Sequence, residues 1–154
     1  MKVFIDTSIL IRHYYGHEKA LKLLDFAINE NNAVISSNVL EETFFKLLYM
    51  ETDRIFGKTG KFVLADKFIK YSERFQPVKT YMEDFLFGSL RSGIIELLMP
   101  TTEIVESSVA IAFDYKLLPN DALIAATCKH YGIKKIATFD DDFKRVDFLE
   151  IVEL

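Results

Sequence analysis

Cysteine is almost absent from this 154-residue chain, which has one, Cys128, and tryptophan is missing altogether. A single thiol cannot form an internal disulfide, and this cysteine usage suits a reducing compartment. No apolar run reaches the about 20 residues that a membrane-spanning helix needs. The N-terminus reads as a strand and not as a signal peptide. With no repeat or linker-like segment, we expect a single cytoplasmic domain over residues 1–154.

The chain also lacks an excess of positive charge, because 19 basic residues face 23 acidic ones and the net charge is −4. This balance argues against a broad nucleic-acid-binding surface. The charge is uneven, however, since residues 54–79 contain seven basic and two acidic residues. That segment is either a solvated helix face or a face that contacts phosphates, and composition leaves both interpretations open.

Hydrophobic residues make up 50% of the chain, which is enough for a substantial core. Val3, Phe4 and Ile5 are consecutive apolar residues, a pattern typical of a parallel strand that is buried on both faces. Further strands are predicted over residues 33–35, 76–79, 133–138 and 148–152. Helices are predicted between them, over residues 8–15, 18–28, 39–50, 61–75, 81–98, 102–115 and 119–131, with a loop over 52–60. Alternating strands and helices predict a three-layer α/β/α fold with a mainly parallel central sheet.

Acidic residues stand just beyond the carboxyl ends of the predicted strands, where parallel sheets gather their ligands. A purely structural interpretation of one such residue, Asp6, is that it caps the N-terminus of a helix. Their recurrence predicts a cluster, and clustered carboxylates repel one another unless a cation joins them. Oxygen ligands without histidine or cysteine favour Mg²⁺ or Mn²⁺ over zinc. The candidate ligands are Asp6, Glu41 or Glu42, Asp121, and Asp140 to Asp142. Spacing alone does not show which of the two glutamates, or which of the three consecutive aspartates, face the site.

Four segments in order resemble a PIN-domain nuclease, in particular the VapC-type toxin ribonucleases of toxin–antitoxin systems. These segments are Phe4-Ile5-Asp6-Thr7-Ser8, Val39-Leu40-Glu41-Glu42, Pro119-Asn120-Asp121-Ala122 and Ala137-Thr138-Phe139-Asp140-Asp141-Asp142-Phe143. The resemblance implies a Mg²⁺- or Mn²⁺-dependent endoribonuclease that acts on single-stranded RNA. It also implies a homodimer and a separately encoded antitoxin.

The resemblance assigns catalytic roles to Asp6, Glu42, Asp121 and Asp140, with Asp6, Asp121 and Asp140 as the metal ligands. Glu42 would hold a second metal or a metal-bound water. Thr138 supplies the expected hydroxyl, and Asp142 is a possible auxiliary ligand. Ser8 is a departure, because the family often has asparagine at that position.

Three other functions stay open at this point. A phosphatase of the haloacid-dehalogenase type also has an aspartate after its first strand, but it needs a second aspartate where Ser8 stands. The chain could also be an RNA-processing PIN nuclease outside a toxin–antitoxin pair, or a PIN-like module that binds RNA or protein without cleavage. Arg12 and the basic segment are candidates for contacting RNA, while a zinc site at His13 and His17 is disfavoured because no third ligand is evident.

Overall fold

The centre of the molecule is a sheet of five parallel strands, which a computed structural model of residues 1–154 shows in the order β3-β2-β1-β4-β5. Strand β1 lies in the middle, and its residues Val3, Phe4 and Ile5 are completely buried, as predicted. The strands are β1 (Lys2–Ile5), β2 (Asn32–Ser36), β3 (Ile95–Leu98), β4 (Lys135–Ala137) and β5 (Glu150–Ile151).

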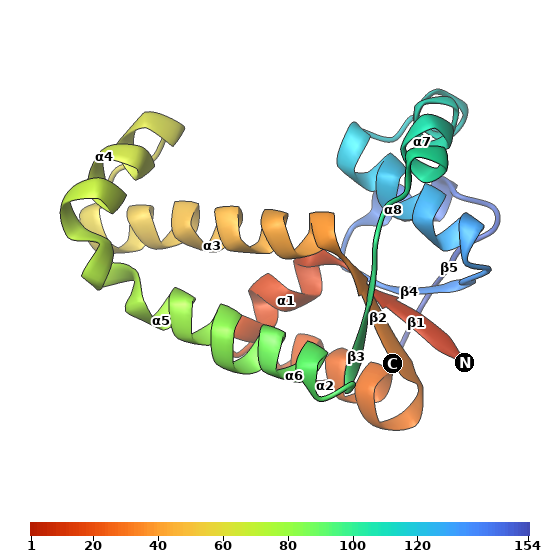
Figure 1. The fold of residues 1–154 in the computed structure, drawn as a ribbon, viewed down its shortest axis with the longest axis horizontal. Helices are drawn as coiled ribbons and strands as arrows, with labels where there is room; N and C mark the ends of the chain where they lie inside the picture. The colour runs from red at the N-terminus through yellow and green to blue at the C-terminus, as the bar shows by residue number, and fades with distance from the viewer.

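Helices cover both faces of this sheet (Figure 1), which confirms the predicted three-layer α/β/α fold. None of them is long and apolar enough to cross a membrane. The α-helices are α1 (Thr7–Tyr14), α2 (Glu18–Asp25), α3 (Ser37–Phe56), α4 (Lys61–Tyr71), α5 (Gln76–Thr80), α6 (Gly88–Arg91), α7 (Thr102–Tyr115) and α8 (Pro119–His130). Segments Phe26–Glu30 (η1) and Tyr81–Phe87 (η3) are π-helical, and Ser72–Phe75 (η2) and Asp141–Arg145 (η4) are 3₁₀-helical.

Helix α3 extends away from the sheet, and the segment from α5 to α6 returns beside it (Figure 1). Helix α4 joins the two at the end farthest from the strands. The loop predicted over residues 52–60 is wrong in its first half, because α3 continues to Phe56. Buried side chains explain this: Thr52 donates a 2.8 Å hydrogen bond to the Leu48 carbonyl, and Glu51 is only 4% exposed. We call this projection, residues 52–80, the arm.

The strand predicted over residues 76–79 is also wrong, since these residues form α5. Pro77 lies in the first turn of this helix, where its missing N–H would have had no intrahelical partner. The helix predicted over 81–98 ends instead at Arg91, and Ile95–Leu98 forms β3. Gly93 adopts a φ of 78°, which turns the chain out of the helix, and β3 then pairs with β2. Apolar spacing alone could not separate these alternatives.

Gly93 therefore has a conformational role that a matched glycine can test. We expect Gly93→Ala to lower the free energy of unfolding by about 1–2 kcal/mol, because a left-handed φ strains any residue with a Cβ. Gly88→Ala should instead raise it by about 0.5–1 kcal/mol, since Gly88 has helical angles and a Cβ there makes only ordinary contact. Urea unfolding measures both values. Equal effects of the two substitutions would contradict this account.

Candidate active site

Asp6 lies at the carboxyl end of β1, on the sheet edge where the predicted acidic residues gather. Its backbone N–H donates to the Ala137 carbonyl of β4 at 3.0 Å, which ties the two strand ends together. Its side chain caps α1 by accepting from the Ser8 N–H. The N-cap interpretation is thus confirmed, and it is compatible with a second role for the carboxylate.

Two hydroxyl groups hold the Asp6 carboxylate in place. Ser8 Oγ and Thr138 Oγ1 each donate a 2.7 Å hydrogen bond to Asp6 Oδ2. The residue is 5% exposed, and burial raises the pKa of its carboxyl, while these hydrogen bonds act in the opposite direction. The hydrogen bonds use Oδ2, so Oδ1 is the oxygen that remains for another ligand.

Glu42, and not Glu41, faces this edge from the second turn of α3. Its Oε2 accepts hydrogen bonds from Thr7 Oγ1 at 2.7 Å and from the Asn120 side-chain amide. Its Oε1 forms a 2.7 Å ion pair with Lys46, one turn farther along the helix. Glu41 is exposed and lines a cavity between α3 and the η3 segment instead. The geometry thus separates the two glutamates, which spacing alone could not.

Asp121, Asp140 and Asp142 approach one another most closely. One carboxylate oxygen from each lies within 4.8 Å of the other two. Burial and, after it, the negative charges of Asp140, Asp6, Glu42 and Asp142 in that order together raise the pKa of Asp121 to about 7. The charges of all four reach Asp121, so these five carboxylates form one acidic cluster at the sheet edge, which we call the pocket.

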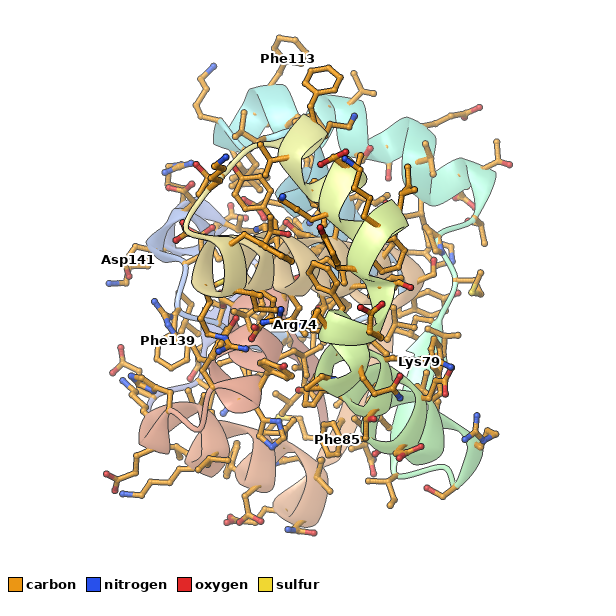
Figure 2. The ribbon with its side chains drawn as sticks, turned by 90° about the vertical axis from the view of Figure 1, so that its left-hand side faces the viewer. Arg74, Lys79, Phe85, Phe113, Phe139 and Asp141 are labelled. Carbon is orange, nitrogen blue, oxygen red and sulfur yellow. The ribbon has the colours of Figure 1, made fainter.

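Asp141 is excluded from the pocket although it lies within the same run of aspartates. Its side chain is 82% exposed, forms a 2.9 Å ion pair with Lys144, and lies at the surface (Figure 2). Asp140 turns the other way and accepts a 2.9 Å hydrogen bond from the Asp142 N–H, which caps η4. The structure therefore selects two of the three aspartates that the sequence left open.

Arg145 holds the Asp142 side of the pocket against the turn before α8. It donates to Asp142 Oδ1 at 2.8 Å, to the Tyr115 carbonyl at 3.0 Å and to the Lys116 carbonyl at 2.7 Å. Sequence reasoning missed this contact, together with the contacts of Asn120 and Lys46 to Glu42. Only Asn120 carried a signal, because it directly precedes Asp121 in a quoted segment.

Other reactive side chains do not form a second site. His13 Nδ1 lies 2.9 Å from the Tyr81 hydroxyl, and its ring stacks on Phe85, so it is part of an aromatic cluster. His17 lies against Phe139. The two histidines thus have different surroundings, which argues against zinc. Cys128 is fully buried in α8, and burial raises the pKa of its thiol, as expected for a structural cysteine.

Comparison with known proteins identifies relatives over nearly the whole chain. Residues 3–149 match the sequence model of the PIN domain. Ribonuclease VapC6 of Methanocaldococcus jannaschii is 36% identical over 155 residues, which cover 98% of this chain and 96% of the relative. Ribonuclease VapC2 of the same organism is 38% identical over 154 residues, with coverages of 99% and 94%.

Solved structures give a similar result for the fold. VapBC2 of Rickettsia felis, bound to a DNA fragment from its promoter, aligns with a TM-score of 0.62 at 17% identity, covering 99% of this chain and 98% of the matched chain. VapC20 of Mycobacterium tuberculosis, a toxin that cleaves the sarcin–ricin loop, aligns with a TM-score of 0.66 at 19% identity, with coverages of 99% and 100%. The α/β/α arrangement is therefore shared with these proteins.

The raised pKa of Asp121 predicts a pH-dependent stability in metal-free buffer. Between about pH 4 and 7 the folded protein keeps a proton on Asp121 that the unfolded chain releases. We therefore expect the free energy of unfolding to fall as pH rises through this window. Asp121→Asn should flatten this dependence, because the amide does not ionise. Urea unfolding at a series of pH values in EDTA measures it, and identical profiles for the two proteins would refute the assignment.

Proposed function

Because the chain belongs to the PIN domain family, we propose that it is a Mg²⁺- or Mn²⁺-dependent endoribonuclease that hydrolyses phosphodiester bonds of single-stranded RNA. The observation that carries the proposal is the shared pocket of Asp6, Glu42, Asp121 and Asp140. The pocket includes a carboxyl whose pKa is raised to about 7 by burial and by its acidic neighbours. Such mutual repulsion in a fixed frame favours a bound divalent cation.

The donor atoms of the pocket suit a hard cation. Asp6, Asp121 and Asp140 would hold it through carboxylate oxygens, and Asp142 would be an auxiliary ligand on the same side. One carboxylate oxygen from each of Asp121, Asp140 and Asp142 lies within 4.8 Å of the other two. Opposite ligands of Mg²⁺ lie about 4.2 Å apart. Small side-chain rotations, or an intervening water, would therefore complete such a site.

The protein groups around the cation would orient the reacting atoms. A bound divalent ion supplies a water of lowered pKa and neutralises charge on the phosphate. Ser8 and Thr138 favour the ionised form of Asp6 by donating to its carboxylate, against the burial that raises its pKa. Glu42 is held by Thr7, Asn120 and Lys46, which places a carboxylate where it can orient the attacking water or accept its proton.

We further propose that the protein is the toxin of a toxin–antitoxin pair, with a separately encoded antitoxin and a homodimeric assembly. The names of its relatives support this role, since two are VapC ribonucleases and one structural neighbour is a VapBC complex. Phe62 and Ile69 on α4 are 89% and 81% exposed and offer an apolar surface for the dimer. An adjacent gene for a small DNA-binding protein would support the toxin role, while its absence would favour RNA processing outside such a pair.

The phosphatase alternative is disfavoured by the surroundings of Ser8. Haloacid-dehalogenase chemistry needs a second aspartate at this position. Here Ser8 Oγ instead donates to Asp6 and accepts from the Phe139 N–H at 2.9 Å. The residue is part of the support of the Asp6 carboxylate and offers no general acid.

Substitution of the pocket aspartates should abolish RNA cleavage. We expect Asp6→Asn and Asp140→Asn each to lower cleavage of single-stranded RNA at least about a hundredfold, because each removes a carboxylate ligand of the cation. The matched control is Asp141→Asn, which changes an exposed aspartate beside Asp140 and should leave the rate within about twofold. Gel-based cleavage assays with Mg²⁺ or Mn²⁺ measure these rates. Wild-type activity in Asp6→Asn would reject the function.

Metal binding distinguishes an enzyme from a non-catalytic module. We expect calorimetric titration with Mn²⁺ to show binding to the wild type and loss of most of it in Asp121→Asn, because Asp121 lies among the other pocket carboxylates. Binding should also raise the melting temperature, since the ion stabilises only the folded state. A wild-type protein that binds no Mn²⁺ would instead favour a PIN module without nuclease activity.

A further inference from the structure

We propose that Arg12 binds the RNA phosphate next to the one that is cleaved, with Phe139 holding its guanidinium in position. This inference rests on the proposed ribonuclease function and specifies how an acidic protein holds a polyanion. The sequence left two sources of positive charge open, Arg12 and the basic segment 54–79. The structure favours the first of them.

Arg12 and Phe139 lie close in the chain to Asp6 and Asp140, respectively. Arg12 is on α1, the helix that Asp6 caps, and Phe139 directly precedes Asp140. The Phe139 N–H donates to Ser8 Oγ, which donates in turn to Asp6. The ring therefore has a fixed position relative to the pocket.

The guanidinium of Arg12 lies over the face of Phe139, with its central carbon 4.0 Å from the ring centroid. His17 packs against the same ring in an edge-on arrangement, with centroids 5.4 Å apart. Figure 2 shows Phe139 at the surface on the same side as Asp141. Stacking restricts the arginine side chain and leaves its N–H edges free, the geometry that suits bidentate binding of a phosphate.

The other cations around the pocket are already paired with its acidic residues. Lys46 binds Glu42 at 2.7 Å, Arg145 binds Asp142 at 2.8 Å, and Lys144 binds Asp141 at 2.9 Å. Arg12 is exposed and forms no ion pair. Its charge is therefore available for a ligand, and its interaction with Phe139 does not neutralise it.

The basic segment lies mainly on the arm, away from the pocket (Figure 1). Arg54 is three turns beyond Glu42 on α3, or roughly 18 Å along the helix. Part of its charge is also balanced locally, because Arg54 pairs with Glu51 and Lys70 pairs with Asp66. The arm cannot supply the charge that the phosphate beside the scissile bond meets.

Salt-dependent binding tests this assignment without requiring cleavage. The probe is a short fluorescein-labelled oligouridylate, bound in MgCl₂ to Glu42→Gln protein, which keeps the three aspartate ligands of the cation, over a series of NaCl concentrations. We expect Arg12→Gln to weaken binding about tenfold. It should also reduce the slope of log affinity against log salt by about 0.7, the value for one phosphate contact on a single strand. Arg12→Lys should keep the slope, because it keeps the charge.

Two further variants separate position from charge. Phe139→Leu should keep the slope and weaken binding, since it removes the support of the guanidinium but no charge. Arg74→Gln is the matched control, because Arg74 lies over Phe56 with its guanidinium carbon 5.7 Å from the centroid, but on the arm. It should leave the slope unchanged. Circular-dichroism melting checks that each variant is folded.

Several results would overturn the inference. The first is an unchanged slope in Arg12→Gln. The second is an equal reduction of the slope in Arg74→Gln or in Arg12→Lys. The third is a parent protein that does not bind the probe. The failure of this inference can be distinguished from the failure of the proposed function. A wild type that cleaves RNA while Arg12→Gln keeps its slope removes only this inference. A wild type that never cleaves removes the function, and the slopes still decide the role of Arg12.

Discussion

Mutual repulsion among carboxylates at one edge of the sheet is the constraint on which this structure depends. The parallel strands bring Asp6 and Asp140 to that edge, and the helices that begin there add Glu42 and Asp121. Fully ionised, these groups destabilise the fold unless donors or a cation lie among them. Much of the polar structure around the pocket consists of such donors, which is why it is concentrated there.

The acidic residues differ in how many hydrogen-bond or ion-pair donors surround them, and this difference bears on where a cation would bind. Asp6 has two hydroxyls, Glu42 has a hydroxyl, an amide and an ammonium group, and Asp142 has Arg145. For Asp121, burial and the charges of its acidic neighbours together raise the pKa to about 7. A divalent cation would supply there the positive charge that the surrounding protein groups do not. The pocket is therefore suited to a metal ion rather than to a proton.

The long helix α3 connects two regions with different physical properties. Its first turns carry Glu42 into the pocket, and its last turns form the arm, where basic residues pair locally with acidic ones. Because the arm lies far from the pocket, the net charge of −4 is a poor guide to the local field that a substrate meets. Arg12 lies over the Phe139 ring and forms none of the ion pairs that engage Lys46, Arg145 and Lys144.

The sequence by itself determined the fold class and the set of acidic positions, because a buried strand followed by a polar residue is a local pattern. Spacing alone did not determine the choice of Glu42 over Glu41, or of Asp140 and Asp142 over Asp141, since neighbouring residues differ only in direction once helices pack. Only the resemblance to the PIN family assigned Glu42 and Asp140. Residues 76–79 and 95–98 were misassigned for a related reason. Their apolar spacing suits helix and strand alike, and only pairing with β2 decided that Ile95–Leu98 is a strand. Tertiary packing decided these points because it depends on contacts between segments that are distant in the sequence, and local spacing carries no information about those contacts.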